Sequence, residues 1–180
     1  MKVLIVVDMQ NDFIDGSLGT QEAKNIVHSV CEKIRNFDGK IYVTLDTHQD
    51  NYLDTFEGKN LPVEHCIKGT NGWLINQSVR NALRGKDYSF IEKPTFGTTQ
   101  LGSSIQMLSI ENKGDFEIEM IGLCTDICVI SNALMLRAKF PEVKITVDAS
   151  CCAGVTPESH EASLMTMRMC QIQVINEQEV

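Results

Sequence analysis

The sequence from Ile121 to Val129 reads Ile-Gly-Leu-Cys-Thr-Asp-Ile-Cys-Val, and the interpretation of the whole chain depends on it. Residues 116–120 before it alternate between apolar and acidic side chains, which is the pattern of a strand. Residues 131–138 after it are rich in Ala and Leu and favour a helix. Cys128 is therefore expected where a strand turns into a helix.

A thiol at that place faces backbone N–H groups and the positive end of the helix dipole, and both stabilise a thiolate. The same N–H groups can hold an oxyanion during acyl transfer. Cys128 is thus a candidate nucleophile. The alternative is that it is a small buried apolar residue, which is the commoner fate of a free cysteine.

Length and composition favour one globular domain, residues 1–180, with 43% hydrophobic and 22% charged residues. The net charge is −8 and no cluster of Lys and Arg is present, so we expect no nucleic-acid partner. No apolar run is long enough to cross a bilayer, so we also expect no membrane partner. The first residues lack the cleavage site of a signal peptide.

The chain contains seven cysteines, an odd number without the spacing of a disulfide framework. This pattern is typical of free thiols in a reducing compartment. We therefore expect a cytoplasmic protein.

Predicted strands and helices alternate along the chain. Strands are predicted at residues 3–7, 41–45, 88–91, 116–121, 142–147 and 171–175, and helices at 22–37, 71–83, 98–109, 131–138 and 157–169. This alternation predicts a three-layer α/β/α fold with a mostly parallel, six-stranded, Rossmann-like sheet.

Several reactive side chains directly follow predicted strands: Asp8, Asp46, His48, Lys93 and Cys128. In a parallel sheet these strand ends lie on one edge, where ligands bind. A lysine beside a cysteine lowers the pKa of the thiol. The alternatives are that Lys93 is a solvated surface charge and that Asp8 only caps the following turn.

Asp46 and His48 are two residues apart just beyond a strand, so their side chains can converge. A polar segment, residues 49–65, follows; we expect it to be a long loop without structure of its own, and it contains Glu57 and His65. A carboxylate and two imidazoles suit a first-row transition metal. The alternative is a hydrogen-bonded pair of Asp46 and His48 at the strand end, with His65 as a loop residue.

This arrangement resembles the isochorismatase-like cysteine hydrolases, the superfamily that includes nicotinamidase. Residues 7–13, Val-Asp-Met-Gln-Asn-Asp-Phe, are similar to the first-strand motif of the family, whose aspartate is the proposed general base. Lys93 looks like the triad lysine, and residues 122–129 look like the nucleophile segment. The resemblance implies that Asp8, Lys93 and Cys128 form the catalytic triad.

The same resemblance implies further features of the site. The N–H groups of Cys124 and Cys128 would form the oxyanion hole, and the Leu123–Cys124 peptide bond would be cis. Phe13 matches a position that stacks on the substrate ring, and Phe96 would line the pocket.

Asp46-Thr47-His48, followed by His65-Cys66, is similar to the metal site of the nicotinamidase branch. The resemblance therefore implies a divalent metal, zinc, manganese or iron, on Asp46, His48 and His65, with Glu57 as a possible further ligand. Many nicotinamidases carry a Trp-Pro pair just before the second metal histidine. Residues 61–65, Leu-Pro-Val-Glu-His, lack that tryptophan.

The implied activity is deamidation of nicotinamide, or of a close analogue, to the acid and ammonia through a thioester on Cys128. The alternatives are an amidase of another small amide or of a ureido or carbamoyl compound, an isochorismatase-type hydrolase, and a thiol sensor or structural subunit without catalysis. By resemblance, we also expect a homo-oligomer.

Overall fold

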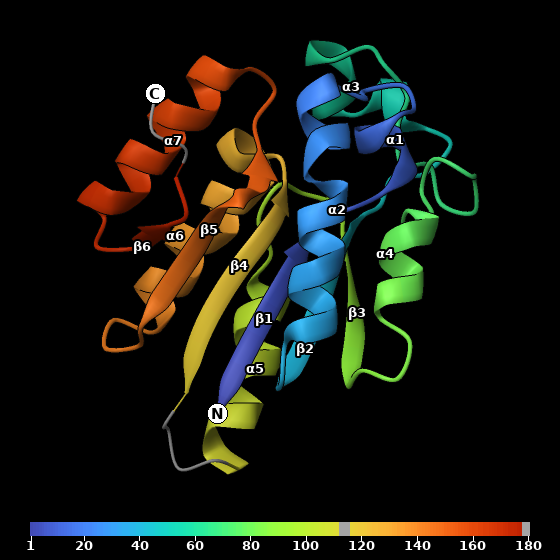
Figure 1. Ribbon diagram of the computed structural model, residues 1–180. Coiled ribbons are helices and arrows are strands. Elements are labelled where there is room, and N and C mark those ends of the chain that lie inside the picture. Colours follow the sequence, from blue (N-terminus) through green and yellow to red (C-terminus); the bar gives the residue numbers. More distant parts are fainter. Residues whose placement is uncertain (112–115, 178–180) are drawn as a thin grey trace.

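The computed structural model describes residues 1–111 and 116–177. Its six strands form one sheet in the order β3-β2-β1-β4-β5-β6, and every strand pair is parallel (Figure 1). The strands are β1 (Lys2–Val7), β2 (Lys40–Asp46), β3 (Tyr88–Lys93), β4 (Glu117–Leu123), β5 (Ile145–Ala153) and β6 (Gln173–Ile175). The predicted α/β fold is confirmed.

Helices cover both faces of the sheet. They are α1 (Asn11–Ile14), α2 (Gln21–Asn36), α3 (Phe56–Asn60), α4 (Gln77–Ala82), α5 (Thr99–Glu111), α6 (Ile130–Lys139) and α7 (Pro157–Met169). Figure 1 shows α2 and α4 on one face and α5 and α6 on the other. The short helices α1 and α3 lie beyond the carboxyl ends of the central strands, at the edge where the reactive residues were expected.

The central strand β1 explains why the sheet is covered on both sides. Residues 3–7 are completely buried. Leu4 and Val6 belong to the core under α2 and α4, whereas the odd-numbered residues belong to the core under α5, α6 and α7. A continuous run of branched apolar residues is what a strand buried on both faces requires.

Two expectations between β2 and β3 were wrong. The helix predicted over residues 71–83 begins only at Gln77, because the side chain of Asn76 accepts a hydrogen bond from the Ser78 N–H (3.0 Å) and caps the helix there. Residues 49–65 are not without structure, since they contain a 3₁₀ turn at Tyr52–Asp54 and helix α3. Thr55 caps α3 by accepting from the Gly58 N–H.

The fifth strand is later and longer than predicted. Met120 of β4 pairs with Val147 and Gly122 pairs with Cys152, so two steps along β4 correspond to five along β5. This bulge keeps Asp148 inside the strand, where its carboxylate lies 2.7 Å from Lys33 of α2. The extra length carries the end of β5, Ala153, to the same edge as the ends of β1 and β4.

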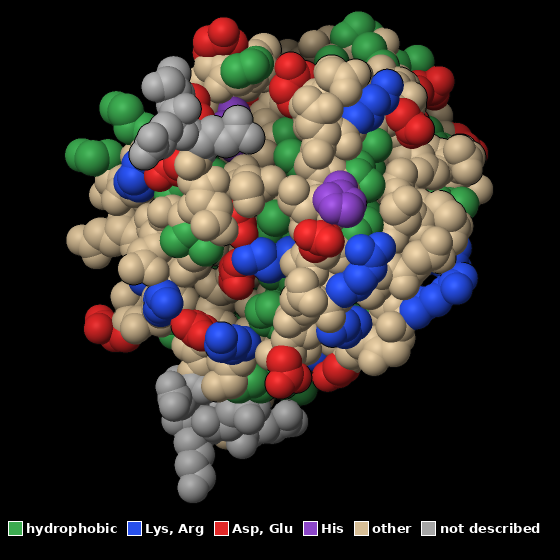
Figure 2. All heavy atoms as spheres, viewed as in Figure 1, with side chains coloured by type: hydrophobic (Ala, Val, Ile, Leu, Met, Phe, Trp, Pro, Cys, Tyr) green, Lys and Arg blue, Asp and Glu red, His purple; other side chains and the backbone are tan. Residues whose placement is uncertain are grey.

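The surface and the cysteines agree with the composition. Figure 2 shows Lys and Arg side chains interspersed with Asp and Glu on the face that α2 covers, without a basic patch. No helix among residues 1–111 and 116–177 is both long and apolar enough to span a membrane. All seven cysteines lie in these ranges and are free thiols, as predicted.

Candidate active site

Asp8 lies at the end of β1, where the backbone turns with a φ of 47°. The Thr44 hydroxyl donates to Asp8 Oδ1 (2.6 Å), and the Asp8 N–H donates to Thr44 Oγ1 (3.2 Å). The other oxygen, Oδ2, faces Lys93. The Asp8 side chain is fully buried, and this burial raises its pKa, an effect that the charge of Lys93 only partly offsets. Asp8 is therefore suited to accept a proton.

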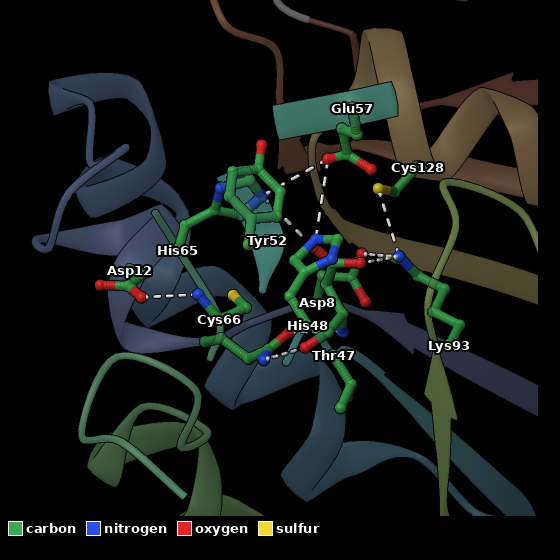
Figure 3. Close-up of polar contacts among 12 residues, drawn as sticks. Asp8, Asp12, Thr47, His48, Tyr52, Glu57, His65, Cys66, Lys93 and Cys128 are labelled. Atoms are coloured by element: carbon green, nitrogen blue, oxygen red, sulfur yellow. Dashed lines mark hydrogen bonds and ion pairs between the residues drawn. The ribbon is translucent and has the colours of Figure 1, made fainter. Parts of the chain in front are cut away.

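Lys93 is the last residue of β3 and is completely buried, so it is not the solvated surface charge that the sequence left as an alternative. Its Nζ lies 2.7 Å from Asp8 Oδ2 and 3.3 Å from Asp46 Oδ1, and it donates to Cys128 Sγ at 3.4 Å (Figure 3). Burial alone would lower the pKa of Lys93, but the neighbouring Asp8, Cys128 and Asp46 raise it well above its usual value. The amine is therefore held as a cation.

Cys128 lies in a π-helical turn, Thr125–Val129, that joins β4 to α6, and α6 begins at Ile130, one residue earlier than predicted. Burial raises the pKa of the Cys128 thiol most, and the negative charge of Asp8 raises it further. The charge of Lys93 lowers it, but the pKa remains well above its usual value. The predicted effect of Lys93, a lower pKa of the thiol, is present but is outweighed by burial and by Asp8. The thiol lies beside the buried carboxylate of Asp8, which is placed to accept its proton.

Cys124 begins this turn, and its carbonyl accepts hydrogen bonds from the N–H groups of Ile127 (3.1 Å) and Val129 (3.0 Å). The Leu123–Cys124 peptide bond is cis, as the resemblance implied. Gly122 has a φ of 117°, and a Cβ there would meet the Val7 carbonyl oxygen at 2.1 Å. Only glycine lets β4 approach β1 this closely at the point where the chain enters the turn.

A cavity of about 230 Å³ opens beside Cys128. Both aromatic residues expected to bind substrate line it. Phe13 is almost buried, with its ring centroid 5.6 Å from that of His65, whereas Phe96 is 45% exposed. The sequence did not single out the other apolar or small lining residues, which are Leu18, Thr20, Leu61, Ile127, Gly154 and Val155. They come from four separate segments of the chain, so no spacing in the sequence groups them.

Asp46, His48 and His65 converge on one point, and each can offer a ligand atom within 4.8 Å of the others. Asp46 Oδ2 lies 3.0 Å from His48 Nε2 and 3.5 Å from His65 Nε2. Glu57 Oε1 lies 3.7 Å from His48 Nε2 and 3.6 Å from His65 Nε2 (Figure 3). Bonds of about 2.0–2.1 Å from a tetrahedral metal place its ligand atoms roughly 3.3 Å apart. Asp46, His48 and His65 therefore fit a divalent cation of the zinc type, and the Glu57 carboxylate lies against the same two imidazoles.

The surroundings of this group favour the same assignment. The backbone carbonyl of Val63 lies 2.8 Å from His65 Nδ1, which leaves Nε2 to face the cluster. Burial would raise the pKa of Asp46, but hydrogen bonds from His48 and His65, together with the Lys93 charge, hold it well below its usual range. The hydrogen bond between Asp46 and His48 that the sequence allowed as an alternative is present, yet His65 and Glu57 join the pair.

Buried polar and aromatic residues that the sequence did not single out support these groups. The ring of Tyr52 packs edge-on against His48 and His65, with centroid distances of 4.7 and 4.9 Å. Asn132 donates from Nδ2 to the Cys128 carbonyl (2.8 Å). Tyr52 lies in a segment expected to be an open loop, and Asn132 lies in a predicted helix whose orientation the sequence did not fix. Neither position carried a signal.

Comparison with known proteins agrees with this geometry. An isochorismatase domain model matches residues 2–179. Nicotinamidase/pyrazinamidase of Mycobacterium tuberculosis is 24% identical over 97% of this chain and 98% of its own length. The crystal structure of nicotinamidase from Bacillus subtilis has a TM-score of 0.83 at 25% identity, covering 97% of this chain and 99% of that one. A zinc complex of pyrazinamidase from Pyrococcus horikoshii has a TM-score of 0.80 at 25% identity, covering 98% and 99%. The chain belongs to the isochorismatase family.

Proposed function

We propose that this protein is an amidase that hydrolyses the C–N bond of nicotinamide, or of a close analogue, to the acid and ammonia. The observation that carries the proposal is the position of Lys93, whose Nζ is 2.7 Å from Asp8 and 3.4 Å from Cys128 beside an apolar cavity. The nicotinamidases among its relatives support the same substrate. Membership of the isochorismatase family supports hydrolysis of an amide bond.

The reaction begins with proton transfer from the Cys128 thiol to Asp8. The sulfur then attacks the amide carbonyl carbon, and a C–S bond forms as the carbonyl π electrons move to oxygen. Lys93 remains a cation throughout and offsets the negative charge on sulfur. The main-chain N–H groups of Cys124 and Cys128 hold the oxyanion of the tetrahedral intermediate.

The intermediate collapses when the C–N bond breaks and Asp8 returns its proton to the departing ammonia. This leaves a thioester between the acyl group and Cys128. Water attacks the thioester with Asp8 as the base, the C–S bond breaks, and the acid leaves as Cys128 regains its proton. One amide and one water are consumed for each acid and ammonia produced.

Asp46, His48 and His65 would hold a divalent metal, with Glu57 as a fourth ligand or a partner of metal-bound water. The donor set of imidazoles and carboxylates favours zinc, with manganese or iron as alternatives, and a relative forms a zinc complex. When bound, the metal supplies a Lewis-acidic position for the pyridine nitrogen. Phe13 and Phe96 would pack against the ring.

Ammonia release from nicotinamide tests the proposal, measured with and without added Zn²⁺, Mn²⁺ or Fe²⁺ beside a Cys128→Ala control. Metal-dependent release that disappears in the control is the expected result. A reactive Cys128 without ammonia release would exclude nicotinamide, and a panel of small amides and carbamoyl compounds would then identify the substrate. Self-association, which we expect from the family resemblance, is tested by sedimentation of the same preparation.

A further inference from the structure

Gln10 lies beside the carboxyl end of β2, where that strand no longer has β1 as its neighbour. Pairing between β1 and β2 ends at Val6 and Val43, and the chain then turns away at Asp8. On the other side of β2, the Thr47 N–H donates to the Lys93 carbonyl (2.9 Å). Backbone groups of successive strand residues point to opposite sides of the strand. Because the Thr47 N–H points toward β3, the N–H and C=O of Asp46 point the other way, into the space beyond the end of the β1–β2 pairing.

The side chain of Gln10 fills this space. Its Oε1 accepts from the Asp46 N–H (2.7 Å), and its Nε2 donates to the carbonyls of Asp46 (2.8 Å) and Trp73 (2.9 Å). The residue is completely buried, and both of its donor hydrogens and its acceptor are used. The amide thus makes the two hydrogen bonds to Asp46 that a neighbouring strand would otherwise supply.

We infer that Gln10 is a positioning residue for the proposed metal site, an inference that rests on the proposed function. With its main chain fixed by Gln10 on one side and by β3 on the other, Asp46 directs Oδ2 to the two histidines and Oδ1 to Lys93. Within the part of the chain that the structure describes, the side-chain hydrogen bonds of Gln10 all go to main-chain atoms, and Gln10 does not line the cavity. Its effect on metal binding passes through the backbone of Asp46.

The chemistry of the amide explains why glutamine occupies this position. Glutamate would present an oxygen without a hydrogen to two carbonyl oxygens, which repel it. Methionine has a similar length and shape but leaves the N–H and C=O of Asp46 without buried partners. A Gln10→Met variant therefore removes the hydrogen bonds while keeping the volume of the side chain.

The experiment compares Zn²⁺ dissociation constants of the wild-type protein, Gln10→Met and Val30→Ala, measured by competition with a chromogenic chelator. Val30 is a fully buried residue of α2 away from the site, so its truncation matches a general loss of stability. Thermal unfolding is recorded for each protein, and binding is measured where all are folded. Loss of an outer-shell partner typically weakens metal binding about 10–100-fold, and this is expected for Gln10→Met but not for Val30→Ala.

Equal Zn²⁺ affinity in folded Gln10→Met and the wild type would overturn the inference and leave the metal site itself intact. Equal weakening in Val30→Ala would also overturn it, since the effect would then be one of stability. If the wild type bound no Zn²⁺, the proposed metal site would fail first. Should Gln10→Met not fold, Gln10→Ala, which leaves room for water at the peptide groups of Asp46, gives the same test.

Discussion

Asp46 and Lys93 are register partners at the ends of β2 and β3, and Asp46 Oδ1 lies 3.3 Å from Lys93 Nζ. The other oxygen of the same carboxylate lies 3.0 Å from His48 Nε2. One buried side chain therefore belongs to both the proposed metal site and the group that surrounds the thiol. The two sites are adjacent because parallel pairing brings both strand ends to the same level of the sheet.

Replacement of Asp8 by asparagine should separate thiol reactivity from turnover. The Asp8 carboxylate raises the pKa of Cys128, whereas Lys93 lowers it. Loss of the carboxylate charge should therefore increase the thiolate fraction at about pH 7–8 and speed alkylation by iodoacetamide. Amide hydrolysis should fall about 10²–10⁴-fold because the proposed general base is lost. Mass spectrometry of the Cys128 peptide and an ammonia assay measure the two effects.

Asp15→Asn serves as the control for this variant, because Asp15 is exposed and lies outside the cavity. It should change neither rate. Slower alkylation in Asp8→Asn would mean that the carboxylate activates the thiol at rest, contrary to the buried geometry.

Replacement of Lys93 by methionine should destabilise the protein strongly. The change leaves the buried carboxylates of Asp8 and Asp46 without their shared cation, and breaking a buried ion pair in this way costs about 3–5 kcal/mol. Lys68→Met removes an ion pair with Glu92 in which the lysine is 48% exposed, and should cost less than about 1 kcal/mol. Urea unfolding of the two variants compares them, and similar costs would show that Lys93 is not the counter-ion of this cluster.

Removal of a proposed metal ligand should affect zinc binding selectively. His65→Ala should weaken Zn²⁺ binding by more than about 100-fold, the upper end of the usual effect of an outer-shell residue. Glu57→Gln should weaken it by less, because the three core ligands remain. His28→Ala is the matched control, since His28 is 81% exposed on α2. Isothermal titration gives the affinities, and unaltered binding in His65→Ala would place the metal elsewhere.

Gly122→Ala should test how closely β4 must approach β1. Both Gly122 and Gly69 have positive φ, but a Cβ meets the Val7 oxygen at 2.1 Å in the first case and nothing within 4 Å in the second. We expect Gly69→Ala to cost about 1–2 kcal/mol from backbone strain. Gly122→Ala should cost about 3 kcal/mol or more, because overpacking adds to the strain. Chemical denaturation of both variants gives the difference, and equal costs would contradict the steric argument.

The sequence predicted features that depend on local pattern. Val3–Val7 is a buried apolar run, and Asp8, Lys93 and Cys128 each follow a strand, so parallel topology alone brings them to one edge. The net direction of the pKa shift of Cys128 could not be predicted in this way. Its pKa depends on how completely the thiol is buried beside Asp8, and that is a property of packing among distant segments.

The sequence pattern likewise did not predict which individual side chains hold the backbone of the site in place. Gln10 binds main-chain atoms of Asp46, and the distance of 36 residues between them has no periodic signature. The bulge that delays the end of β5 is another example, because residues 148–153 continue a strand that was predicted to end at residue 147. Elements were predictable, whereas the contacts between them were largely not.

The walls of the cavity and its reacting groups have different origins in the chain. Asp8, Lys93 and Asp46 are held by neighbouring strands, whereas Leu61, Phe96 and Val155 come from three separate connections between elements. Substitutions in the connections can therefore reshape the space offered to a substrate while the strand ends keep the reacting atoms in place. Part of the shape of the cavity can therefore change without altering the strand ends that hold Asp8, Asp46 and Lys93.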